Sequence, residues 1–318
     1  MKVIILKTNL RDGLQVVERA ISESANLPIL KNILFKTVGN KIQLAATNLE
    51  LGVTKMISGK IIEEGGLTIP FQTFYGLVNN VNSEKINLET ANNTLIFKTD
   101  NYEAKIQGLH EDEFPIIPKL DHAEKYLEFN SETLQEALGK VVTAAQISEI
   151  RPEISGVLFD FQNTIIKLVA TDSFRLAEKT LYNNQYQTNF DKAFKVIVPL
   201  KTIQEALRIF RHKQPIRIFI DQNQILFRNE DVEMISRLID GNYPDYEQIV
   251  PKNFESEVAF EKEHLVHALK LVSNFSGKVN DVRLKMQDDQ KIMEVYSSNQ
   301  YLGENNYLIP SKLTGTPF

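Results

Sequence analysis

An internal repeat constrains this chain more than any other feature of its sequence. When Ile33 is placed on Val157, the stretch ILFKTVGNKIQLAATN matches VLFDFQNTIIKLVATD, and the same offset aligns the apolar positions upstream of both stretches. A third, weaker copy begins after Lys252. Self-similarity at a fixed period indicates a repeat architecture, here with about 125 residues in each copy. We therefore expect three tandem domains, at residues 1–122, 123–252 and 253–318.

Each copy mixes helices with antiparallel strands. Apolar residues at helical spacing precede the matched strands, and Pro70 and Pro199 occupy equivalent places where a second helix begins. Alternating runs such as IRIFI and VRLKM predict strands with one buried face and one wet face. The expected fold class is α+β, with two helices packed on antiparallel sheets in each repeat. The third repeat reaches Phe318 before its second helix, so we expect it to be incomplete and the chain to be truncated at its C-terminus.

Composition excludes several function classes. The 318-residue chain has no cysteine, which removes disulfides, thiolate nucleophiles and cysteine-ligated zinc. No apolar run approaches the roughly 20 residues that cross a bilayer, and the start MKVIILKTNLRDG lacks a signal-peptide core. We expect a cytoplasmic protein with no membrane partner. The net charge of −5 argues against binding nucleic acid through overall charge, but it allows a local basic surface.

Two groups of polar residues invite a catalytic or metal-binding interpretation. The corner Thr171-Asp172-Ser173 lacks an evident histidine partner, and its counterpart in the first repeat, Asn48-Leu49, has no nucleophile. An Asx-type turn is therefore favoured over catalysis, and a hydrolase with a site at Asp172 stays an alternative. His264 and His267 lie three apart without a third ligand, so we expect no metal and no cofactor.

Three separated segments carry a resemblance to a known family. They are LPILKNILF from Leu27, VATDSFRLA from Val169 and LIDGNYPDYEQIVPKN from Leu238. In their order and spacing the chain resembles the bacterial sliding clamp, the beta subunit of DNA polymerase III. This resemblance implies a DNA clamp fold and a head-to-tail homodimer that closes a ring around duplex DNA. It also implies a non-enzymatic processivity factor for DNA replication, which tethers the DNA polymerase III catalytic subunit, the clamp loader and other proteins with clamp-binding motifs.

In that family the helices line the central hole, so the resemblance assigns sequence-independent contacts with DNA to basic residues on their wet faces. In the helix expected over 200–213, basic residues recur opposite the apolar stripe. The DNA-facing residues that we predict are Arg11, Arg19, Lys140, Arg151, Lys201, Arg208, Arg211 and Lys270.

The resemblance also places a groove for partner peptides between the second and third domains. Leu176 and Ile249 would form apolar walls, and Arg175 would line the rim. An alternative is that Phe174 and Leu176 are core residues. The predicted groove residues are Ile154, Thr171, Ser173, Phe174, Arg175, Leu176, Pro244 and Ile249.

The last expectation concerns self-association. By resemblance, an edge strand of the first domain, with Ala104 and Ile106, would pair with an edge of the partner's third domain around Leu271, Val272 and Phe275. Because the third repeat is short, we expect a weaker dimer than that of a longer clamp. A monomeric adaptor that binds clamp-binding peptides without closing a ring stays open as an alternative.

Overall fold

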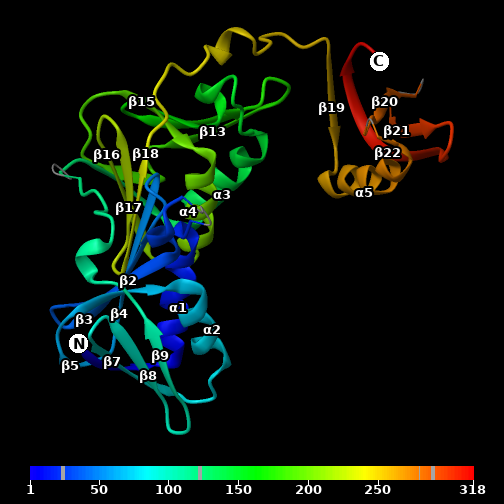
Figure 1. Cartoon of the computed structure of the whole chain (residues 1–318). Helices are drawn as coiled ribbons and strands as arrows, with labels where there is room; N and C mark the ends of the chain where they lie inside the picture. Colours follow the sequence, from blue (N-terminus) through cyan, green and yellow to red (C-terminus); the bar gives the residue numbers. More distant parts are fainter. Residues whose placement is uncertain (23–25, 121–123, 279, 288–290) are drawn as a thin grey trace. The chain divides into compact units, whose positions relative to one another are not determined.

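The computed structural model describes residues 1–22, 26–120, 124–278, 280–287 and 291–318 (Figure 1). It divides into two compact units, Met1–Pro244 and Asp245–Phe318. The first unit contains two copies of one arrangement of strands and helices. The second unit contains one helix of regular length among its described residues.

The first copy runs through two helices and nine strands: β1 (Lys2–Leu6), α1 (Lys7–Val17), β2 (Asn32–Val38), β3 (Lys41–Thr47), β4 (Leu51–Ile57), β5 (Lys60–Glu63), β6 (Gly66–Pro70), α2 (Phe71–Asn80), β7 (Lys85–Ala91), β8 (Thr94–Lys98) and β9 (Glu103–Gln107). The second copy repeats this order: β10 (Tyr126–Asn130), α3 (Ser131–Val141), β11 (Gly156–Phe161), β12 (Ile165–Thr171), β13 (Leu176–Tyr182), β14 (Tyr186–Thr188), β15 (Phe194–Pro199), α4 (Leu200–Ile209), β16 (Pro215–Ile220), β17 (Gln224–Arg228) and β18 (Val232–Arg237). The expected α+β repeat is confirmed in both copies.

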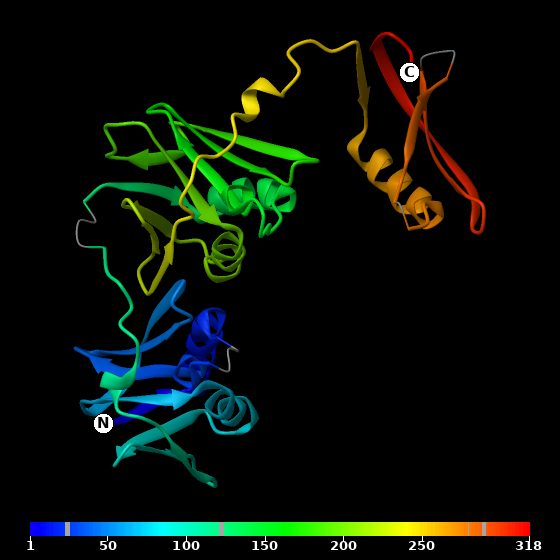
Figure 2. The same ribbon diagram turned by 45° about the horizontal axis from the view of Figure 1, so that its top comes forward.

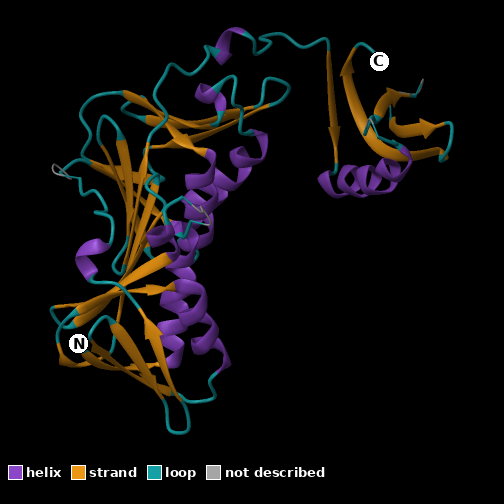
Figure 3. Cartoon of the chain, in the orientation of Figure 1, coloured by secondary structure: helices purple, strands orange, loops and turns teal. Residues whose placement is uncertain are grey.

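Helices and sheets of the first unit form separate layers. The four helices lie on one side of the sheets (Figure 3). Helix α1 buries Leu10, Leu14 and Val17 against the sheet. It approaches closely because Gly13 has no side chain: a Cβ there would lie 2.7 Å from Ile57 and 2.8 Å from Leu44. Such a contact is shorter than real Cβ atoms make, so glycine is required for this packing.

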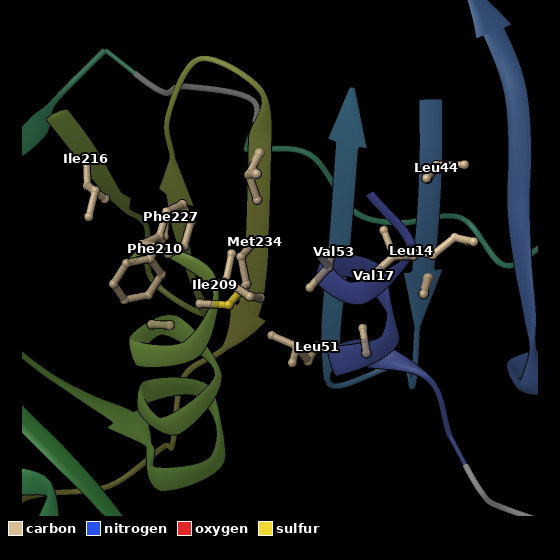
Figure 4. Close-up of a cluster of buried hydrophobic side chains, with 14 of the residues drawn as sticks. Leu14, Val17, Leu44, Leu51, Val53, Ile209, Phe210, Ile216, Phe227 and Met234 are labelled. Carbon is tan, nitrogen blue, oxygen red and sulfur yellow. The ribbon is translucent and has the colours of Figure 1, made fainter. Parts of the chain in front are cut away.

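The two copies join edge to edge. Strand β18 of the second copy pairs antiparallel with β4 of the first, and this pair makes one nine-stranded sheet in the order β14-β10-β16-β17-β18-β4-β3-β2-β6. The hydrophobic core continues across the joint: Leu51 and Val53 of the first copy face Ile209 and Met234 of the second (Figure 4). On the opposite face, Ile117 of the connecting segment packs against apolar clusters of both copies. Hydrogen bonds and apolar burial therefore both hold this joint.

Helix α4 is shorter than the sequence predicts. We expected a helix over 200–213, but α4 ends at Ile209, because Phe210 leaves helical geometry with ψ 51° and buries its ring near that of Phe227, 6.2 Å away. Arg211 consequently lies beyond the helix, so its expected place on the helical stripe is wrong.

The second unit is small. It contains β19 (Ser256–Phe260), α5 (Lys262–Val272), β20 (Arg283–Met286), β21 (Ile292–Asn299) and β22 (Gly303–Gly315), with the sheet order β19-β22-β21-β20. Figure 2 shows α5 beside these strands. The core of this unit consists of six buried side chains: Ala268, Val272, Met286, Met293, Val295 and Ile309.

Candidate functional surfaces

The turn between β12 and β13 is built by its own side chains. The Asp172 carboxylate accepts hydrogen bonds from the backbone N–H groups of Phe174 (3.0 Å) and Arg175 (2.9 Å), and from the Arg175 guanidinium (2.9 Å). The Thr171 hydroxyl donates to the Arg175 carbonyl at 2.8 Å. Ser173 has a left-handed backbone with φ 75°. The bonds from Arg175 and Phe174 lower the pKa of Asp172 to about 2.

The first repeat has the same turn without a carboxylate. The Asn48 side-chain oxygen accepts from the N–H groups of Glu50 (3.0 Å) and Leu51 (2.8 Å), the Thr47 hydroxyl donates to the Leu51 carbonyl, and Leu49 also has φ 75°. Because an amide does the same work in one copy, the Asp172 carboxylate needs no catalytic explanation. The structure thus supports the expected Asx-type turn.

The expected groove residues fall into buried supports and exposed side chains. Ile154 and Thr171 are buried, whereas the Phe174 side chain is 96% exposed. Leu176 is half-buried at the start of β13. The alternative that Phe174 is a core residue is therefore wrong.

Pro244 is the last residue of the first unit. The Tyr243 hydroxyl before it donates to the Val169 carbonyl on β12 at 3.5 Å, and burial raises the pKa of Tyr243 to about 12. This contact anchors Pro244 to the strand that leads into the Thr171 turn. Ile249 belongs to the second unit, where it is 74% exposed.

Sequence reasoning missed two exposed apolar side chains near this turn. Ile147 and Ile150 are 68% and 92% exposed in the loop that leads to β11. The Ser155 hydroxyl fastens this loop to the backbone of Ser148, and the Arg151 guanidinium donates to the Ser173 hydroxyl at 3.3 Å. Isoleucines at 147 and 150 in the run QISEIRPEI, outside the helical pattern, were the available signal.

Acidic neighbours engage most of the basic residues that we predicted to face DNA. Glu205, itself buried on α4, binds Arg208 at 2.6 Å and lies 3.9 Å from Arg19 of the first copy. Arg11, Lys140 and Arg151 form ion pairs with Asp12, Glu136 and Glu153. Lys201, Arg211 and Lys270 are exposed, and within the described ranges they form no ion pair. The helical side of the chain is thus only weakly basic.

The residues expected at a dimer interface divide between a strand and a helix. Ala104 and Ile106 lie on β9, the outer strand of the sheet β5-β1-β7-β8-β9. Leu271 and Val272 end α5, and Phe275 ends the short 3-10 helix η7 (Ser273–Phe275). The expectation that this second segment forms a strand edge is therefore wrong. Val272 is fully buried in the core of the second unit, because the apolar face of α5 carries it there.

The histidine pair has a structural explanation in part. The His267 ring packs edge-on against the Tyr307 ring at 5.6 Å. Among the residues that the structure describes, no group of three or more His, Asp or Glu side chains could hold a metal ion. In the same described part of the chain, no helix is long and apolar enough to span a membrane.

Comparison with known proteins gives consistent matches. The family model of the DNA polymerase III beta subunit N-terminal domain matches residues 1–118, and that of the central domain matches residues 128–245. The chain is 25% identical over 324 residues to the beta sliding clamp of Synechococcus elongatus, covering 100% of this chain and 86% of that protein. It is also 25% identical over 304 residues to the beta sliding clamp of Streptococcus pneumoniae, covering 92% and 79%.

Solved structures agree on the fold. A DNA polymerase sliding clamp from Bacillus subtilis superposes with a TM-score of 0.93 at 23% identity, covering 100% of this chain and 86% of that one. A sliding clamp from Pseudomonas aeruginosa, solved bound to griselimycin, gives 0.92 at 22% identity, with coverages of 100% and 86%. The two domain models together span well over half of this chain, and it belongs to the family of DNA polymerase III beta subunits. The resemblance stated from the sequence is confirmed.

Proposed function

We propose that this chain is a DNA sliding clamp that acts by topology and not by chemistry. Two copies would join head to tail, encircle duplex DNA and hold the replicative polymerase on it. The expected place of work is the cytoplasm, on the chromosome. The observation that carries the proposal is the joint between β18 and β4, which adds one repeat to the next edge to edge and keeps the helices on one side. Continued through further repeats, this construction encloses a space lined by helices.

The electrostatics of the helical side suit sliding. Most of its cations are held by carboxylates, and Lys201 and Arg211 remain exposed for phosphates. Contacts with phosphates alone carry no base information, so the ring can move along any sequence. Persistence on DNA then comes from closure of the ring and not from tight binding.

The partner side of the proposal rests on the turn at residues 171–176. Phe174, Ile147 and Ile150 are exposed apolar side chains on two loops that the Arg151–Ser173 hydrogen bond joins. A few apolar anchors usually dominate the affinity of such a surface. We assign to it the short hydrophobic motifs of the polymerase, the clamp loader and other partners.

Topological retention on DNA tests the function. The protein is loaded by a bacterial clamp loader and ATP onto a nicked circular plasmid, and the plasmid is separated from free protein by gel filtration. We expect the protein to elute with the circle and to be lost once a restriction enzyme makes the plasmid linear. Equal retention on linear DNA contradicts encirclement. Failure on the circle, with partner-peptide binding intact, favours the monomeric adaptor.

A further inference from the structure

Three strand edges are open in the described part of the chain. Strand β9 is paired only with β8, and β13 is paired only with β12. In β22, the segment from Gly303 to Ile309 is paired with β21 on one side only. Open edges offer unpaired backbone groups, so each can take up another strand.

The open edge of β9 is equivalent to β18, the strand that makes the joint between the two copies. Both strands are the second arm of a hairpin with the same ion pair: Lys98 binds Glu103 at 3.3 Å in the first copy, and Arg228 binds Glu233 at 2.7 Å in the second. Glu103 of β9 therefore occupies the place of Glu233 of β18.

The open edges of β13 and β22 are both equivalent to β4, the acceptor in that joint. Each of these strands follows a turn closed by an Asn or Asp side chain, at Asn48, Asp172 and Asn299. The residues opposite the preceding strands correspond as well: Gly52 faces Thr47, Leu176 faces Thr171 and Glu304 faces Ser298. One donor edge thus has two acceptors of the same kind.

The register of the existing joint predicts which side chains would meet. In that joint Glu233 faces Thr54, Met234 faces Val53 and Ile235 faces Gly52. Transferred to β9 on β22, the register puts Lys105 opposite Glu304 and Ala104 opposite Asn305. Transferred to β9 on β13, it puts Glu103 opposite Glu178 and Ala104 opposite Ala177.

These pairs differ in sign. Lys105, Glu103, Glu178 and Glu304 are all exposed, and residues directly opposite in an antiparallel pair lie on the same face. Opposite charges in such a pair stabilise it and like charges destabilise it. On β13, Lys98 would also have to serve two carboxylates, because it already binds Glu103.

We propose that these charges select the partner edge when two copies of the chain meet: Lys105 and Glu304 favour β9 on β22, and Glu178 repels Glu103 and keeps β9 off β13. The inference rests on the proposed head-to-tail ring. It places the partner edge at Gly303–Tyr307 and not at Leu271–Phe275.

Mixed single-cysteine variants test the proposal, because the chain has no cysteine of its own. An Ala104→Cys chain is mixed under mild oxidation with an Asn305→Cys chain or with an Ala177→Cys chain. Directly opposed residues lie about 4.5–5.5 Å apart, within the range of a disulfide. All four charges stay in place. We expect cross-linked heterodimers with Asn305→Cys and few with Ala177→Cys.

Charge reversals then isolate the cause. Glu178→Lys in the Ala177→Cys chain is expected to raise its cross-linking at least about fivefold. Glu304→Lys should lower cross-linking at Asn305→Cys, and Lys105→Glu in the partner should restore it. Equal cross-linking of both native-charge mixtures, cross-linking of neither, or indifference to Glu178→Lys overturns the proposal. Retention of the cysteine-free chain on circular DNA reports on the ring separately, so the two failures are distinguishable.

Discussion

At the scale of single residues, one position in the repeat shows how a shared structure supports different properties. Asn48 and Asp172 both accept two backbone N–H groups from the residues that follow them. The sequence predicted this turn from the alignment of the copies alone. It did not predict that Phe174 would project into solvent, because exposure depends on which neighbouring segments cover the turn.

The Asp172 turn should make stability depend on pH in a narrow window. Its pKa is about 2 in the fold against an ordinary 3.8, so between these values the unfolded chain binds more protons than the folded one. The stabilisation is therefore complete above about pH 4 and is lost as the pH falls through 2. Asp172→Asn keeps an acceptor oxygen, as Asn48 shows, but does not titrate. In urea titrations from pH 5 to pH 2, the wild type should lose more free energy of unfolding than the variant. Parallel curves would contradict this assignment.

The same turn should carry partner binding. Leu176→Asp places a charge at an apolar wall, so we expect a labelled peptide with a Gln-Leu-Phe type motif to bind at least about 2 kcal/mol more weakly. Phe174→Ala should also weaken binding without a folding defect, because its side chain is 96% exposed. Leu49→Asp, at the exposed turn of the first repeat, is the matched control. Equal affinities for wild type and Leu176→Asp, measured by fluorescence anisotropy, would remove the groove.

At the scale of elements, the repeat predicted the order of strands and helices because apolar spacing follows from local geometry. It failed where tertiary packing decides. Phe210 continues the apolar spacing of α4, yet its ring is drawn into the core and ends the helix. The segment at 271–275 was taken for a strand edge from family position, although Val272 continues the helical spacing of α5. Neither outcome depends on residues within a single turn of the chain.

Two glycines of the second copy should respond in opposite directions to the same substitution. A Cβ on Gly156 would lie 2.3 Å from the Val198 carbonyl oxygen, a backbone atom of the paired strand β15. Gly156→Ala should therefore lower the free energy of unfolding by about 1–3 kcal/mol. A Cβ on Gly139 meets nothing within 4 Å, so Gly139→Ala in α3 should raise it by about 0.5–1 kcal/mol. Chemical denaturation compares the two, and loss of stability in both variants would show that α3 packs more tightly than described.

At the scale of the whole molecule, an acidic chain contacts DNA only if charge is distributed unevenly. The sequence predicted which cations lie on the helical side but not which of them are free. Ion pairs form between segments far apart in sequence, as when Glu205 of the second copy meets Arg19 of the first. The candidates for direct phosphate contact in the first unit therefore reduce to Lys201 and Arg211.

This distribution predicts opposite effects on DNA binding. Lys201→Ala/Arg211→Ala removes two exposed cations, so affinity for duplex DNA should fall for every sequence and the salt slope should decrease by about 0.9 per lost phosphate contact. Glu205→Gln should raise affinity, because it releases Arg19 and Arg208. Anisotropy of a labelled duplex across a salt series measures both. Lys36→Ala/Arg237→Ala removes the same charge from the strands and is the matched control. If the control weakens binding as much as Lys201→Ala/Arg211→Ala does, net charge and not the helical side governs contact with DNA.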